Sequence, residues 1–83
     1  MSAVAQPLSY RFIVEADPAG DALVRILAPF MVQGAVLEAV DHVLSDASAL
    51  TTIRAAGLAP DQAKTMVDRL GSLPIVRTVG FGW

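Results

Sequence analysis

The sequence predicts an α+β domain: a four-stranded antiparallel sheet with two helices packed on one face. Three observations support this prediction. Strand-like and helix-like runs alternate along the 83 residues in the order β-α-β-β-α-β. Each helix-like run has a proline near its start and a glycine at its end, an asymmetry typical of helices. A chain of this length has room for one hydrophobic core only. An order of this kind is the split-βαβ, or ferredoxin-like, sandwich.

The first strand is predicted at residues 8–16, LSYRFIVEA, because apolar side chains alternate with other side chains along it. Two of the alternating residues are aromatic, Tyr10 and Phe12. Aromatic side chains in a half-buried strand are far more often part of a core than a platform for stacking bases. Residues 1–7 are small, polar or proline, and we expect a flexible N-terminal arm there. The single domain is therefore predicted to span residues 8–83.

The first helix is predicted to begin at Asp17 and Pro18, with Asp17 capping free N–H groups and Pro18 in the first helical position. Gly34 stands where a left-handed residue commonly ends a helix. Pro29 lies inside the run and removes one backbone hydrogen bond, so we expect a kink there or an early end. The apolar stripe has helical spacing and consists of Leu23, Ile26, Leu27, Phe30 and Met31.

The middle of the chain is predicted to form a hairpin. Residues 35–43 show a blurred alternation, which is typical of a strand with a bulge. Ser45 and Asp46 are expected in the turn, and residues 48–56 form the next strand with Thr51 and Ile53 on one face. A second helix should run from Pro60 to Gly71, with core positions at Ala63, Met66, Val67 and Leu70.

The last strand is predicted at residues 73–81, and Pro74 near its start marks it as an edge strand. Right-handed crossovers place the first and third strands in the centre of the sheet and the second and fourth outside. Pro74 and Arg77 protect one edge, whereas residues 35–40 contain no Pro, Lys or Arg. An unprotected edge favours pairing with another chain. We therefore expect a symmetric homodimer through the second strand, with Val36, Leu37, Glu38 and Val40 at the interface.

Composition excludes several classes of function. The net charge is −2 and the six basic residues are scattered, so no nucleic-acid surface is indicated. The chain has no Cys and a single His, His42, which argues against a metal site or a thiol nucleophile. The first residues lack the features of a signal peptide, and no apolar run approaches the roughly 18 residues of a membrane span. We expect a cytoplasmic protein without a cofactor.

The spacing of several residues resembles the ACT domain family, most closely the small regulatory subunits of acetolactate (acetohydroxyacid) synthase. An acidic residue and a glycine, Asp17 and Gly20, precede the helix, which carries the segment Leu23-Val24-Arg25-Ile26. Gly34 follows 11 residues beyond Leu23 and opens a strand that runs through Glu38. Residues 52–57 and 70–76 also resemble the third strand of the family and its passage from helix to strand.

This resemblance implies a homodimer that binds a small amino acid, typically a branched-chain one, between its subunits. Free N–H groups at the helix start can hold a carboxylate, and glycine at position 34 would let a ligand approach the backbone. The resemblance also implies a partner, the catalytic, thiamine-diphosphate-dependent large subunit of acetolactate synthase. The implied ligand-binding residues are Asp17, Gly20, Asp21, Ala22, Leu23, Gly34, Ala35 and Val36.

Other functions of the same topology remain as alternatives. A pure assembly subunit without a ligand would share all the features above. A small hydrolase of the acylphosphatase type needs an Arg in the first turn and a nearby Asn, but the turn here is acidic and the chain has no Asn. RNA-recognition domains place aromatics on the third strand, and residues 48–56 contain none. We therefore expect a binding module that has no catalytic residues and is not an enzyme.

Overall fold

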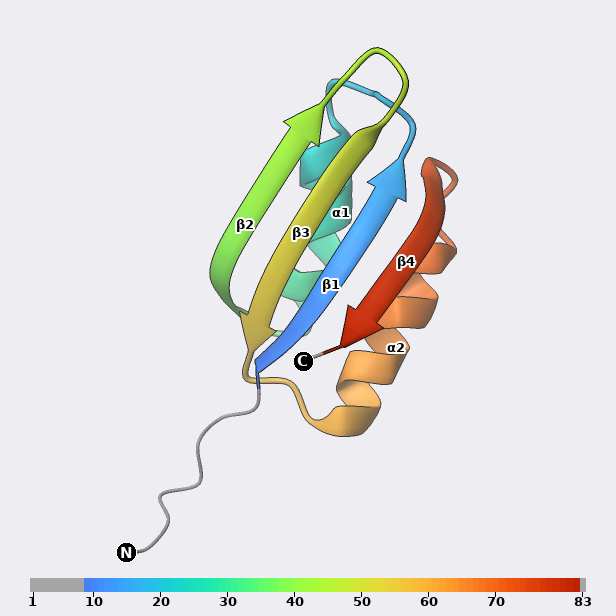
Figure 1. Ribbon diagram of the computed structural model, residues 1–83. Coiled ribbons are helices and arrows are strands. Elements are labelled where there is room, and N and C mark those ends of the chain that lie inside the picture. The colour runs from blue at the N-terminus through green and yellow to red at the C-terminus, as the bar shows by residue number, and fades with distance from the viewer. Residues whose placement is uncertain (1–8, 83) are drawn as a thin grey trace, which may run out of the picture.

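The predicted order of elements is confirmed in the computed structural model, which describes residues 9–82 (Figure 1). The predicted arm at residues 1–7 and the first residue of the predicted strand lie outside the described residues. Neither described helix is long and apolar enough to cross a membrane. The elements are β1 (Ser9–Ala16), α1 (Ala22–Val32), β2 (Val36–Leu44), β3 (Ala49–Ala56), α2 (Pro60–Gly71) and β4 (Val76–Gly82).

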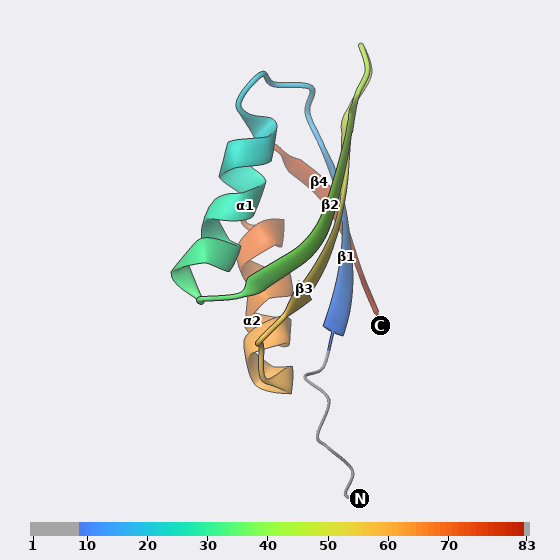
Figure 2. The same cartoon turned by 90° about the vertical axis from the view of Figure 1, so that its left-hand side faces the viewer.

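The four strands form one antiparallel sheet in the order β2-β3-β1-β4. Strands β1 and β3 are therefore central and β2 and β4 are the edges, as predicted. Both helices cover the same face of the sheet, and within residues 9–82 no helix lies over the other face (Figure 2). The ferredoxin-like sandwich expected from the sequence is confirmed.

The core lies between the sheet and the helices. Phe12 on β1 is fully buried and pairs with Ile53 of β3 and Phe81 of β4 across the sheet. Its ring meets that of Phe30 on α1 edge to face, with centroids 5.0 Å apart, an arrangement that aromatic pairs favour. Tyr10 is also buried, so the predicted core role of both β1 aromatics is confirmed.

The predicted start of α1 is wrong by several residues. The helix begins at Ala22 with Asp21 as its N-cap, and no side chain makes a capping bond. Asp17 is instead held at the end of the sheet, because its backbone N–H donates to the carbonyl of Ile75 at 2.8 Å. Pro18 consequently lies in the loop between β1 and α1 and not in the first helical turn.

Pro29 does not end α1, which continues to Val32. Gly34 follows with a φ of +71°, so its predicted left-handed conformation is confirmed. The next N–H, that of Ala35, donates to the carbonyl of Phe30 at 3.0 Å and closes the end of the helix.

The predicted bulge in β2 is present, because the register with β3 shifts between Leu37 and Ala39. The predicted turn is also present: the backbone N–H of Ser45 donates to the carbonyl of Ser48 at 2.9 Å. The expected start of the last strand is wrong, since β4 begins at Val76. Pro74 therefore precedes the strand, within a turn closed by a bond from the N–H of Val76 to the carbonyl of Leu73.

Candidate functional site

The free edge of β2 exposes apolar side chains on the side of the sheet that the helices cover. Val40 and Leu44 lie opposite Ile53 and Ala49, both fully buried, so all four side chains belong to that helix-covered face. Yet Val40 is 40% exposed and Leu44 is 54% exposed. Helix α1 thus leaves the helix-covered side of β2 partly open at its edge.

Helix α1 also carries a second apolar stripe, which differs from the one predicted to face the core. Val24, Leu27 and Met31 follow at i, i+3 and i+7 and so share one side of the helix. A different side of the helix, with Pro29 and Val32, lines a small pocket shared with the end of α2. The stripe is not part of that lining, and two of its residues, Val24 and Met31, are mostly exposed.

The four residues predicted at a dimer interface differ in how they lie. Val36 is 59% exposed at the start of β2, and Val40 is described above. Leu37 lies opposite Ala55 and packs against the core. Glu38, the bulge residue, is exposed, and its carboxylate accepts a hydrogen bond from the hydroxyl of Ser9 on β1. Val36 and Val40 are thus the two whose exposed apolar side chains favour an interface.

The residues predicted to bind a ligand fall into two groups at opposite ends of α1 (Figure 1). Residues 17–23 form the loop before the helix and its first turn, and residues 34–36 follow its last turn. The helix has 11 residues, so its ends are about 16 Å apart at 1.5 Å per residue. A single subunit therefore does not bring the two groups together.

The first turn of α1 has unused hydrogen-bond donors. Within residues 9–82, the backbone N–H groups of Leu23 and Val24 donate to no carbonyl and to no capping side chain. Asp21 would add negative charge here, but its carboxylate pairs with the guanidinium of Arg25 at 2.8 Å. Ala22 is fully buried and its N–H already donates to the carbonyl of Ala19 at 3.1 Å, so it offers no free donor. A Cβ at Gly20 would meet open space. This turn could hold a small anion.

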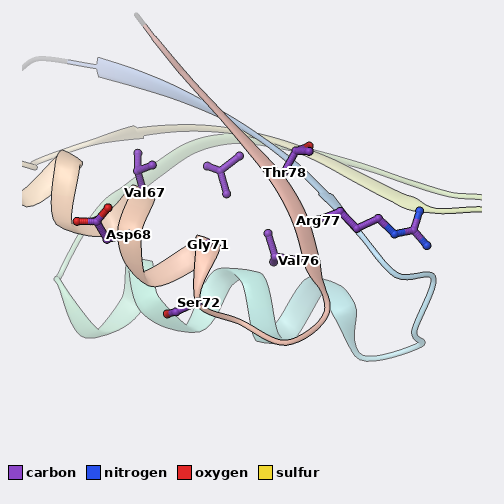
Figure 3. Close-up of a pocket in the computed structure, with 8 residues that line it drawn as sticks. Val67, Asp68, Gly71, Ser72, Val76, Arg77 and Thr78 are labelled. Atoms are coloured by element: carbon purple, nitrogen blue, oxygen red, sulfur yellow. The ribbon is translucent and has the colours of Figure 1, made fainter.

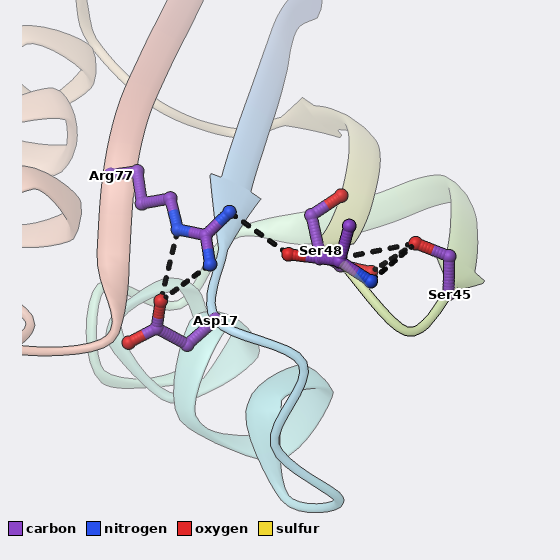
Figure 4. Close-up of polar contacts among 5 residues, drawn as sticks. Asp17, Ser45, Ser48 and Arg77 are labelled. Atoms are coloured by element: carbon purple, nitrogen blue, oxygen red, sulfur yellow. Dashed lines mark hydrogen bonds and ion pairs between the residues drawn. The ribbon is translucent and has the colours of Figure 1, made fainter.

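Asp17 is engaged in a polar network instead of pointing to that turn (Figure 4). Its Oδ1 accepts a hydrogen bond from Nε of Arg77 at 2.9 Å, and Nη2 of the same guanidinium forms an ion pair with this oxygen at 2.9 Å. The same guanidinium donates through Nη1 to the carbonyl of Ala47 in the β2–β3 turn at 3.0 Å. Arg77 thus ties the loop before α1 to the hairpin, a role that the sequence does not reveal because Asp17 and Arg77 are 60 positions apart.

A shallow pocket of about 470 Å³ lies between α2 and β4 (Figure 3). The carboxylate of Asp68 is at one side, and the guanidinium of Arg77 points away from the α2 end of the pocket. The hydroxyl of Ser72 donates to the carbonyl of Arg69. The lining residues are Val67, Asp68, Gly71, Ser72, Val76, Arg77, Thr78 and Val79.

The described residues contain no group of three or more His, Asp or Glu side chains that could hold a metal. His42 is half-buried on β2, and its Nδ1 forms a 2.8 Å hydrogen bond with Oγ1 of Thr51 on β3. Thr51 is fully buried, so this bond satisfies a polar group inside the sheet. We assign His42 a structural role beside the β2 edge.

Solved structures with the same fold include an ACT domain and the C-terminal domain of an MgtC protein. The crystal structure of the ACT domain from GTP pyrophosphokinase of Chlorobium tepidum superimposes with a TM-score of 0.81 at 12% identity, covering 93% of this chain and all of that one. Its solution structure gives 0.77 at 12% identity, over 90% of this chain and 85% of that one. The C-terminal domain of the MgtC protein from Mycobacterium tuberculosis gives 0.75 at 19% identity, over 98% and 92% of the two chains.

No sequence model of a protein family matches this chain, and no curated protein matches it significantly. At such low identities the structural likeness establishes the fold that this chain shares with these domains. It leaves the ligand and the partner to be argued from the geometry of the chain itself.

Proposed function

We propose that this chain is a dimeric regulatory module that binds a small amino acid between its subunits. The observation that carries the proposal is the open β2 edge, with Val40 and Leu44 exposed on the helix-covered face of the sheet. Pairing two such edges would continue the sheet to about eight strands, within the usual range. It would also bring the apolar stripes of two α1 helices together and cover the exposed side chains.

Such pairing would complete the candidate ligand site. In a symmetric antiparallel pair centred near Val40, the start of one β2 lies beside the end of the other. The end of β2 and the start of α1 lie at the same end of the molecule (Figure 1). Residues 34–36 of one subunit would therefore approach residues 20–23 of its partner, although one subunit alone keeps them apart.

The chemistry of the two groups suits an aliphatic amino acid. The N–H groups of Leu23 and Val24 would receive the carboxylate, as helix N-termini commonly do. Ala35 and Val36 would contact the side chain of the ligand and leave room for a branched one. On the strength of the resemblance in sequence, we further propose valine, leucine or isoleucine as the ligand and the large subunit of acetolactate synthase as the partner.

The test combines oligomeric state and ligand response. Val40→Glu places a charge at the proposed interface, and we expect sedimentation equilibrium to show monomers in place of dimers. Wild-type protein should melt several degrees higher with millimolar valine, because a ligand that binds only the folded state stabilises it. The Val40→Glu monomer should lose this response, since its site would be incomplete.

Val32→Glu is the matched control, because Val32 is 75% exposed on the side of α1 that faces α2. It should remain dimeric and keep the response to valine. A wild-type monomer, or a Val40→Glu variant that stays dimeric, would refute the pairing.

A second candidate function is an assembly subunit without a ligand, favoured by the engagement of Asp17 with Arg77. A dimer that melts at the same temperature with valine, leucine, isoleucine and other amino acids would support it. Copurification of the tagged chain with an acetolactate synthase large subunit from the native host would then identify the partner, and failure to do so would remove that assignment.

A further inference from the structure

Two arginines lie directly opposite each other on the face of the sheet that no helix covers. Arg11 of β1 and Arg54 of β3 are partners in the antiparallel register of the two central strands. Their neighbours along the strands, Tyr10 and Ala55, point to the buried face. Both guanidinium-bearing side chains are exposed on the uncovered face.

Neither arginine of this pair forms an ion pair within the described part of the chain. The ion pairs found there join Arg25 with Asp21 and Arg77 with Asp17, and neither involves Arg11 or Arg54. Glu38 borders the same pocket as the two arginines, and its carboxylate accepts a hydrogen bond from the hydroxyl of Ser9. Like charges directly opposite each other on neighbouring strands destabilise a sheet. A bound anion would offset this repulsion.

The surroundings leave room for such a ligand. In the same row of the sheet, the position beyond Arg54 is Ala39 and the position beyond Arg11 is Gly82. Neither carries a bulky side chain. A pocket of about 300 Å³ lies beside the two arginines and is lined by Ser9, Tyr10, Arg11, Glu38 and Arg54. Its volume is at the lower end of the range for small-molecule sites.

We propose that this two-arginine pocket binds the oxyanion group, carboxylate or phosphate, of a small metabolite. Two guanidinium groups can offer paired N–H donors in the planar geometry that such oxygens accept. Glu38, on the bulge, borders the same pocket and can accept a hydrogen bond from a hydroxyl or ammonium group of the ligand. The pocket lies on the opposite face of the sheet from α1, so it is distinct from the site proposed between subunits.

The experiment is an NMR titration of the ¹⁵N-labelled full chain with inorganic phosphate and, separately, with acetate, at constant ionic strength. We expect saturable shifts of the Arg11 and Arg54 Nε–Hε signals. Arg11→Gln and Arg54→Gln should each weaken binding about tenfold or more, since a hydrogen bond between charged groups is worth about 1.5–3 kcal/mol. Glu38→Gln should tighten binding of both anions, because it removes a nearby negative charge.

Arg69→Gln is the control, because Arg69 is an exposed arginine of α2 that is outside this pocket. It should bind both anions like wild type. Tighter binding of phosphate would assign a phosphate ligand, and tighter binding of acetate a carboxylate. Shifts that stay linear with concentration for both anions would overturn the proposal. An equal loss of anion affinity in Arg69→Gln would also overturn it. The wild-type titration tests the proposal even if a glutamine variant fails to fold.

Discussion

Gly34 combines a left-handed backbone conformation with a position among the predicted ligand-binding residues. Its φ of +71° lies in the left-handed region, although a Cβ there would meet no other atom within 4 Å. We expect Gly34→Ala to lower the free energy of unfolding by about 1–2 kcal/mol, the cost of this conformation for a residue with a Cβ. Urea unfolding followed by circular dichroism measures the change.

Gly71→Ala is the control for that substitution, because Gly71 is helical and its surroundings are equally open. Alanine should be neutral or stabilising there. Asn at position 34 should recover part of the loss, since Asn adopts the left-handed conformation more readily than other residues. Equal stability of Gly34→Ala and Gly71→Ala would contradict the backbone explanation.

Single residues also show where sequence reasoning works and where it stops. The alternation of Tyr10, Phe12 and Val14 predicts their burial correctly, because a strand repeats every two residues. The contact between Asp17 and Arg77 could not be predicted in this way. It joins a loop and a strand that only the folded sheet brings together, and no local pattern encodes it.

At the scale of an element, α1 retains a proline that a helix interior disfavours. Pro29 has no N–H to donate, so the carbonyl of Arg25 lacks its helical partner. We expect Pro29→Ala to raise the free energy of unfolding by about 1–3 kcal/mol, given the cost of an interior proline. Thermal or urea unfolding at neutral pH would measure this gain.

Pro60→Ala provides the comparison, because Pro60 occupies the first turn of α2, where no helical hydrogen bond is lost. Its effect should stay within about 0.5 kcal/mol. A Pro29→Ala variant no more stable than Pro60→Ala would mean that packing of the proline ring against its neighbours offsets the missing bond.

The boundaries of elements were less predictable than their existence. Proline and glycine signals placed α2 correctly at Pro60–Gly71. Equivalent signals placed the start of α1 too early, because Asp17 can cap a helix but is held by the sheet instead. Likewise, the sequence predicts Pro74 inside a strand, whereas it belongs to the turn before β4. Local sequence signals identify candidate ends of helices and strands, and tertiary contacts decide which of these ends the fold uses.

At the scale of the whole molecule, the sequence predicts the order of the strands in the sheet. It does not predict how the two groups of candidate ligand-binding residues come together. Strand order follows from chain connectivity and the handedness of crossovers, which belong to one chain. The two groups of ligand-binding candidates lie at opposite ends of α1 and would meet only across a two-fold axis. Their spacing in the sequence contains no information about that distance.

Dimerisation through β2 should therefore also appear in the stability of the whole molecule. If the folded state is a dimer, its unfolding becomes dependent on protein concentration by mass action. For a chain of this size, a hundredfold increase in concentration should raise the melting temperature by roughly 5 °C or more. Differential scanning calorimetry over that range measures the shift.

The melting temperature of Val40→Glu should not depend on concentration, and that of Val32→Glu should behave like wild type. This pair separates loss of the interface from a general effect of adding a charge, because both valines are exposed in one subunit and only Val40 lies on the β2 edge. A concentration-independent wild type would show that a second copy of the chain does not cover the exposed side chains of β2. Two-fold pairing would then have to be abandoned, and with it the shared ligand site.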